Sequence, residues 1–184
     1  MESPYFGITV IIIAIVGLFL WLIRGRISIK SHWRHFYDNI QFSALEFYEQ
    51  VKAGLAERNI EGIRFSSEEI NESHVLSAKR VYLNVGEKEY EFYICAAPFG
   101  TGTFVSWWLC IRDEQLINRI PVLSTLFGID RSNKTFYQMD TEAMYLSAIH
   151  TVVVSVADSL TSVSGYRLSE TDRQYIRYKE ISVQ

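Results

Sequence analysis

The feature that most constrains the fold is the stretch Phe92–Cys110, which reads FYICAAPFGTGTFVSWWLC. Two apolar runs flank the segment Pro98–Gly102, a pattern typical of two strands joined by a tight turn. Near this turn, apolar residues occupy both alternating positions of each run, so both faces of the sheet need cover there. We therefore expect an antiparallel sheet around this hairpin, whose turn end is either packed over or exposes an apolar patch.

Side-chain alternation assigns the residues of this hairpin to two faces of the sheet. The first run is half-buried at its start, where Tyr90, Phe92 and Ile94 alternate with Glu89 and Glu91. In the second run, one face carries Val105, Trp107, Leu109 and Ile111, and the other carries Phe104, Trp108 and Cys110. Further strands are expected over 63–70, over 75–85 with a turn at Gly86, and over 135–139. The sequence thus predicts an antiparallel meander of four or five strands.

A first helix is expected to begin after Ser43. Ser43 is placed to cap it, Glu46 completes a capping box, and Phe42 packs on Phe47 as a hydrophobic staple. The helix is expected to end near Asn59. Its predicted apolar stripe consists of Leu45, Tyr48, Val51 and Leu55.

A longer helix is expected over 140–164, with Met139 and Met144 as a second staple and Gly165 as its end. Its broad apolar face comprises Tyr145, Ile149, Val152, Val153, Val156, Leu160 and Val163. The opposite face is small and hydroxylated and comprises Ser147, Thr151, Ser155, Asp158 and Ser162, with His150 at its edge. This face is either a solvent face or a surface packed closely on another helix or on a partner subunit. The tail from Ser169 is expected to form a short helix.

The N-terminal run Tyr5–Ile23 contains nineteen residues and no charge. As a helix it would be roughly 28 Å long, close to the hydrocarbon thickness of a bilayer. A signal peptide would instead have a positive start and a small-residue cleavage site, and this chain has neither. We therefore expect residues 1–24 to form a transmembrane anchor with a short extracytoplasmic N-terminus.

The charges flanking this run predict its orientation. Residues 1–35 carry Arg24, Arg26, Lys30 and Arg34 against Glu2, a net charge of +3, which leaves −6 on the rest of a chain with net charge −3. By the positive-inside rule, the C-terminal bulk lies in the cytoplasm. The chain is thus expected to be a single-pass protein of a bacterial plasma (inner) membrane. Its acidic remainder argues against nucleic-acid binding.

Residues 25–42 are expected to form a basic and aromatic juxtamembrane stem in contact with the lipid bilayer, and residues 43–184 a cytoplasmic domain. Within the stem, Trp33, Phe36 and Tyr37 either extend the first helix backwards or lie at the membrane surface. The predicted fold class is therefore α+β: an N-terminal single transmembrane helix, followed by a two-layer domain made of a helix, the meander and a long C-terminal helix.

The sequence contains no signature of catalysis. It has no phosphate-binding loop, no nucleophile elbow, no zinc helix and no EF-hand loop. His32 and His35 share the spacing of some metal ligands but lack accompanying Cys or carboxylate ligands, so they are interpreted as juxtamembrane polar residues. Cys95 and Cys110 are interpreted as buried free thiols, with a disulfide between facing strands as the alternative. No catalytic residue, cofactor or metal is assigned.

The segment 118–128, NRIPVLSTLFG, is a candidate cover for the turn end of the hairpin. Pro121 in a first turn and Gly128 at a C-terminal cap predict a short helix. This helix would either pack on the sheet or rest on the membrane beside the anchor.

These features favour a membrane-anchored interaction or adaptor domain without catalytic activity, acting with a protein partner or as a homo-oligomer. The alternative is a membrane-tethered sensor or effector that binds a small ligand beside the turn at 98–103. A third possibility, a membrane-remodelling or pore-forming protein, would require oligomerisation because the anchor has no polar residue to line a pore. The candidate partner or ligand surface comprises Phe99, Trp107, Trp108, Leu123, Phe127, His150 and Asp158.

Overall fold

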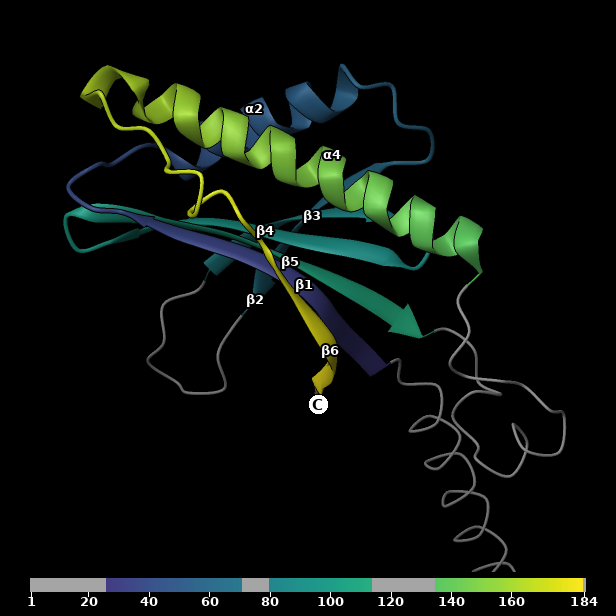
Figure 1. Ribbon diagram of the computed structural model, residues 1–184. Coiled ribbons are helices and arrows are strands. Elements are labelled where there is room, and N and C mark those ends of the chain that lie inside the picture. Colours follow the sequence, from purple (N-terminus) through teal and green to yellow (C-terminus); the bar gives the residue numbers. More distant parts are fainter. Residues whose placement is uncertain (1–25, 71–79, 114–134, 184) are drawn as a thin grey trace, which may run out of the picture.

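The computed structural model describes residues 26–70, 80–113 and 135–183. Its elements are β1 (Arg26–Tyr37), α2 (Ala44–Ala56), β2 (Arg64–Ile70), β3 (Arg80–Glu87), β4 (Tyr90–Phe99), β5 (Gly102–Asp113), α4 (Phe136–Thr161), η2 (Ser162–Ser164) and β6 (Ile176–Val183). The six strands form one antiparallel sheet in the order β2-β3-β4-β5-β1-β6, and both α-helices lie on one face of it (Figure 1). The α+β class, the antiparallel sheet and the long C-terminal helix are confirmed. The expected anchor, 1–24, lies outside the described residues.

The predicted hairpin is the centre of the sheet. β4 and β5 pair from Tyr90 with Ile111 to Phe99 with Gly102, and the two-residue turn between them places Gly100 at φ 59°. Trp107 is fully buried on the helix side. Trp108 faces the other side, as the alternation predicts.

The residues assigned to a stem form a strand instead of a helix extension or a membrane-surface segment. β1 pairs with β5 along its whole length, and Trp33 and Tyr37 are 2% and 0% exposed in the core. β6 then adds to the outer edge of β1, where the sequence predicted a short helix. The sheet therefore has six strands rather than four or five. Both corrections have one cause: β1 and β6 each form a strand by pairing with residues far away in the chain.

Helix α2 begins as predicted. The Ser43 side chain accepts a hydrogen bond from the Glu46 amide, and the rings of Phe42 and Phe47 lie 5.9 Å apart. The buried face is shifted from the predicted stripe, because Leu45 is 70% exposed and Phe47 is fully buried. The full buried set is Phe47, Tyr48, Val51 and Leu55.

Helix α4 begins one turn earlier than predicted, and no strand is formed by 135–139. Thr135 and Gln138 make a complete capping box, which starts the helix at Phe136 ahead of the Asp140 signal. The helix passes into a 3₁₀ turn that ends at Gly165, with φ 72°, as predicted. Val163 was placed on the apolar face but is 97% exposed, since the chain has left the α-helix there.

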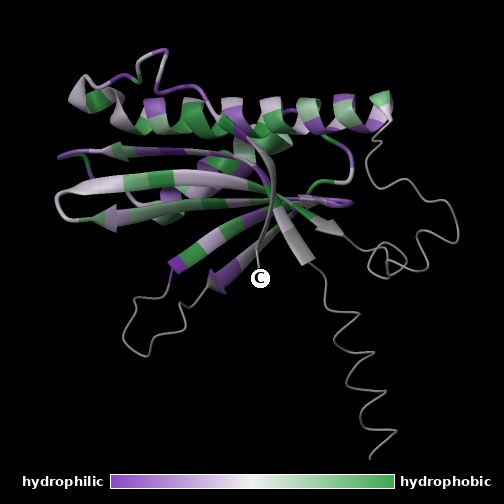
Figure 2. Cartoon of the chain, turned by 60° about the horizontal axis from the view of Figure 1, so that its bottom comes forward, coloured by the Kyte–Doolittle hydropathy of each residue, from purple (hydrophilic) through white to green (hydrophobic). Residues whose placement is uncertain are grey.

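The two faces of α4 differ in burial. Within the described part of the chain, Ser147, Thr151 and Ser155 are exposed. By length and composition Phe136–Ser164 is apolar enough to cross a membrane. Its apolar side, however, packs on the sheet, and Figure 2 shows the helices green toward the strands. The apolarity of α4 is thus accounted for by the domain core.

Of two further local predictions, the turn at Gly86 is corrected and the buried free cysteines are confirmed. Gly86 lies inside β3, and the turn between β3 and β4 is formed by Lys88 and Glu89, with Lys88 at φ 50°. Cys95 and Cys110 are free and buried, as the favoured interpretation predicted. Cys110 pairs with Glu91, four residues along β4 from Cys95, or roughly 13 Å at strand spacing. A disulfide is excluded at that separation.

Candidate functional site

The face of the sheet opposite the two helices is here called the open face. No helix among the described residues 26–70, 80–113 and 135–183 covers it (Figure 1). Paired residues of neighbouring antiparallel strands share a face, so Phe36, Phe104 and Ala97 lie side by side on it. Arg34 precedes Phe36 on the same face and is exposed.

Two aromatic side chains form an exposed pair at one corner of the open face, here called the distal pair. Phe36 is 40% exposed and Phe99 is 67% exposed, and their rings meet edge to face at 6.1 Å. This is the turn end of the hairpin, where the sequence required either cover or an exposed patch. In the described part of the chain the patch is exposed.

The backbone beneath the distal pair is closely packed. A Cβ at Gly102 would lie 2.7 Å from Cζ of Phe36 and closer still to the carbonyl oxygen of Tyr37, so only glycine fits there. Gln41 donates a hydrogen bond to the carbonyl of Gly100. The distal pair therefore sits on a rigid support, which lowers the entropic cost of binding through it.

The distal pair lies far from the start of β1. Arg26 pairs with Asp113 at one end of β1, and Phe36 pairs with Phe104 at the other. Ten residues of strand separate the two ends, or about 33 Å. The turn end of the hairpin thus lies at the opposite end of the domain from the point where the chain enters the sheet.

A stack of three rings closes the open face beside β6. His32 lies between Trp108 and Tyr178, at centroid distances of 4.7 Å and 4.9 Å. His32 is 2% exposed and its Nδ1 has no hydrogen-bond partner. Burial, and then the nearby Arg34 guanidinium, lower the pKa of His32, which keeps the ring neutral at pH 7. The stack attaches β6 to the sheet.

His32 and His35 do not form a metal site. Residues three apart in a strand point to opposite faces, and His35 lies on the helix side with Tyr37 and Tyr166. Among the described residues, no group of three His, Cys, Asp or Glu side chains is placed to hold a metal ion.

Three of the predicted site residues, Trp107, His150 and Asp158, belong to a polar cluster on the helix side, here called the tail cluster. The segment 166–175 crosses β1 and α4 and is fastened by side chains from the core. His150 donates from Nε2 to the carbonyl of Arg173 at 2.7 Å and accepts at Nδ1 from the Trp107 indole at 3.2 Å. The Trp33 indole donates to the carbonyl of Asp172 at 2.6 Å.

These partners require neutral His150 with its proton on Nε2. Burial lowers the pKa of His150 more than the bond to the Arg173 carbonyl raises it. Asp158 pairs with Arg173 at 2.5 Å. His150, Trp107 and Asp158 therefore take part in holding the tail segment.

The remaining members of the tail cluster are His35, Tyr166 and Asp172. His35 Nε2 lies 2.7 Å from the Tyr166 hydroxyl, and His35 Nδ1 lies 3.9 Å from an Asp172 carboxylate oxygen, beyond hydrogen-bond reach. Burial lowers the pKa of His35, partly offset by Asp172. The buried Tyr37 hydroxyl and one Asp158 oxygen have no partner in the described structure. The contacts of His35 and Trp33 with Tyr166 and Asp172 hold the tail segment against β1.

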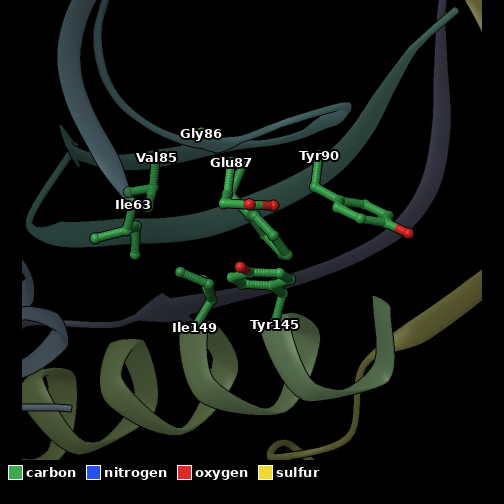
Figure 3. Close-up of a pocket in the computed structure, with 8 residues that line it drawn as sticks. Ile63, Val85, Gly86, Glu87, Tyr90, Tyr145 and Ile149 are labelled. Atoms are coloured by element: carbon green, nitrogen blue, oxygen red, sulfur yellow. The ribbon is translucent and has the colours of Figure 1, made fainter. Parts of the chain in front are cut away.

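A small hollow lies between α4 and the β3–β4 hairpin (Figure 3). Ile63, Tyr90, Tyr145, Ile149 and the buried carboxylate of Glu87 line it. Its volume is about 10 Å³, which is room for one water molecule. It is not beside the turn at 98–103, where a ligand pocket was expected.

The predicted site residues are thus dispersed. Phe99 and Trp108 lie on the open face, whereas Trp107, His150 and Asp158 lie on the helix side; Leu123 and Phe127 lie outside the described residues. Of the basic stem residues, Arg34 is on the open face, Arg26 and Lys30 lie in β1, and Arg24 is outside the described residues.

The sequence prediction missed Phe36, Tyr178 and three members of the tail cluster, His35, Tyr166 and Asp172. A signal for the open face was present in the sequence: His32, Arg34 and Phe36 recur with a period of two, which predicts one face of a strand. A scan against protein-family models finds no match to this chain, and no curated protein and no solved structure matches it.

Proposed function

We propose that this chain is a membrane-anchored interaction domain without catalytic activity. The run Tyr5–Ile23 holds it at the plasma membrane, and the domain faces the cytoplasm. The distal pair binds a protein partner. The observation that carries the proposal is the exposure of Phe36 and Phe99 on a rigid support, about 33 Å from the first residue of β1.

The position of the distal pair favours a protein partner over lipid. The chain enters β1 at Arg26, three residues after the apolar run ends. That end of the sheet is therefore held near the bilayer, while the distal pair can extend into the cytoplasm. Aromatic side chains on a preorganised support are typical anchors of protein interfaces.

The charge beside the distal pair favours a particular chemistry in the partner. Arg34 is exposed on the same face. From Arg34 and its neighbour Cys95 to the turn of the hairpin, the described residues of β1, β4 and β5 place no acidic side chain on the open face. The partner segment is therefore expected to offer an apolar side chain to Phe36 and Phe99 and a carboxylate to Arg34. It is expected to be a protein other than a second copy of this chain.

Photo-crosslinking in native membranes tests this function. The full chain carrying benzoylphenylalanine at position 99 is expected to form one discrete adduct with another protein. The matched control carries the same group at position 45, where Leu45 is exposed on α2 on the other side of the sheet. Phe36→Ala is expected to reduce the adduct about thirtyfold, since an aromatic anchor typically contributes about 2 kcal/mol. Arg34→Glu is expected to reduce it as well.

Three results would overturn the proposed binding surface. They are no adduct at position 99, the same adducts at positions 99 and 45, and an adduct with the mass of two copies of this chain. Orientation is tested separately, with a phosphatase fused to the C-terminus. The fusion is expected to be inactive outside the membrane, and an active fusion would refute the cytoplasmic placement.

The ligand-binding alternative has less support. Its expected lining residues Trp107, His150 and Asp158 hydrogen-bond within the tail cluster, and the hollow in Figure 3 holds no more than one water.

A further inference from the structure

A second exposed apolar surface lies at the start of α4. Phe136 is 85% exposed and Tyr137 is 74% exposed, and Met139 and Met144 are 44% and 64% exposed. Four large apolar side chains thus fall within the first three turns of one helix, which is here called the α4 start patch. A patch of this kind on a folded domain indicates contact with a partner or a membrane.

The α4 start patch lies at the same end of the domain as the start of β1. The Tyr90 hydroxyl donates to the Gln138 carbonyl at 3.2 Å, which fixes the first turn of α4 over the start of β4. Across the sheet, Tyr90 pairs with Ile111, and Ile111 pairs with Ser28. Two strand spacings, about 10 Å, separate Tyr90 from Ser28. Figure 1 shows the start of α4 and the start of β1 at one side of the domain.

The length of chain before β1 limits how far this end can be from a bilayer. If the span ends at Ile23, the three residues to Arg26 reach at most about 10 Å when extended. The headgroup layer on each side of the hydrocarbon is itself about 5–7 Å thick. The start of β1 must therefore lie at or next to the headgroup layer, and this brings the end of the domain that carries the α4 start patch close to the bilayer.

We infer that the α4 start patch docks on the membrane surface beside the anchor, so that the domain has a second lipid contact. The inference rests on the membrane anchor of the proposed function. An aromatic pair with methionines suits the boundary between headgroups and acyl chains. Lys88, in the β3–β4 turn at this end, is exposed and ion-paired with Glu87, and it adds a cation at the same end of the sheet as Arg26.

This second contact restricts the orientation of the domain. A single short tether allows a domain to rotate about it, whereas two contacts, the chain start and the α4 start patch, hold the sheet at a defined tilt. The distal pair lies at the other end of β1 and is then presented away from the bilayer. Docking of α4 thus places the partner surface where a cytoplasmic protein reaches it.

Fluorescence quenching in vesicles tests the inference with the full chain. Cys95 and Cys110 are buried, so an added cysteine is labelled selectively. A Tyr137→Cys variant, labelled with an environment-sensitive dye in phosphatidylcholine–phosphatidylglycerol vesicles, is expected to emit at shorter wavelength and to lose intensity with spin-labelled lipid. The matched control is Val163→Cys, 97% exposed at the other end of the same helical region, and no such quenching is expected there. With the dye moved to Met144→Cys, the added change Tyr137→Ser is expected to weaken quenching.

The outcomes separate the inference from the proposed function. If the chain floats with the vesicles but the label at position 137 is not quenched, the docking of α4 is overturned and the anchor is left intact. A blue-shifted label that lipid quenchers do not affect means that protein covers the patch, which also overturns the inference. A chain that does not float with vesicles overturns the anchor and, with it, both proposals.

Discussion

Gly102 offers a sharp test of the packing beneath the distal pair. A Cβ at this position would lie 2.7 Å from a ring carbon of Phe36, with the Tyr37 carbonyl oxygen nearer still. Since carbon atoms in contact ordinarily lie about 3.5–4.0 Å apart, β1 and β5 must separate there by about 1 Å. Overpacking of a rigid site costs about 1–3 kcal/mol. We expect Gly102→Ala to lose about 3 kcal/mol, because one of the atoms that must move belongs to the backbone.

Two other glycines serve as controls. Gly100 has open space around its Cβ position but φ 59°, so Gly100→Ala is expected to cost roughly 1–2 kcal/mol through backbone strain alone. Gly86 has its nearest neighbour at 3.8 Å and no left-handed φ, so Gly86→Ala is expected to change stability by less than about 1 kcal/mol. The expected loss of stability is therefore largest for Gly102→Ala, smaller for Gly100→Ala and smallest for Gly86→Ala.

Urea unfolding of the full chain in detergent, followed by tryptophan fluorescence, measures these differences. With a slope of about 2 kcal/mol per molar urea, Gly102→Ala is expected to lower the midpoint by about 1.5 M. A midpoint for Gly102→Ala equal to or above that of Gly100→Ala would refute the close approach of β1 to the turn. The pairing of Phe36 with Phe104 would then be in doubt as well.

Further predictions concern the core. Trp107→Phe removes the indole donor to His150 and is expected to cost about 2–3 kcal/mol in the same assay; a loss below about 0.5 kcal/mol would contradict the hydrogen bond. Burial lowers the pKa of His150 from 6.5, so the unfolded state binds the proton more tightly and stability is lost as pH falls below about 6.5. The unfolding free energies at pH 7.5 and pH 5 are expected to differ less in His150→Gln than in the unchanged chain. An equal difference in both would exclude His150 as a source of the pH dependence. Burial raises the pKa of Cys110 to about 12, so both thiols, Cys95 included, are expected to react with Ellman's reagent only on unfolding, and fast reaction of the native chain would refute their burial.

The elements predicted correctly from sequence depend on residues close together in the chain. The Ser43 cap, the Phe42–Phe47 staple and the end of α4 at Gly165 each involve neighbours within five residues. The errors at the start of α4 and at the β3–β4 turn came from choosing between two local signals. Thr135 with Gln138 makes a complete capping box, and no such pair accompanies Asp140.

The candidate site was predictable only in part. Phe99 and Trp108 were identified because apolar residues fill both faces of the hairpin, which is visible in the sequence. Trp107, His150 and Asp158 were also selected, but Trp107 donates a hydrogen bond to His150, and His150 and Asp158 bond to Arg173 of the tail segment. Residue type marked them as candidates, but their partners lay in a segment that the sequence predicted to be a helix.

The sequence by itself determined the hairpin, the two helices and the alternation of faces, because turns, caps and side-chain periods are properties of short segments. It also determined the apolar run at 5–23 and its flanking charges. Only the tertiary structure decided that β1 and β6 complete the sheet and that His35 meets Tyr166, a pair 131 residues apart. Such contacts depend on which distant strand closes an open sheet edge, and no local pattern in either segment specifies its partner.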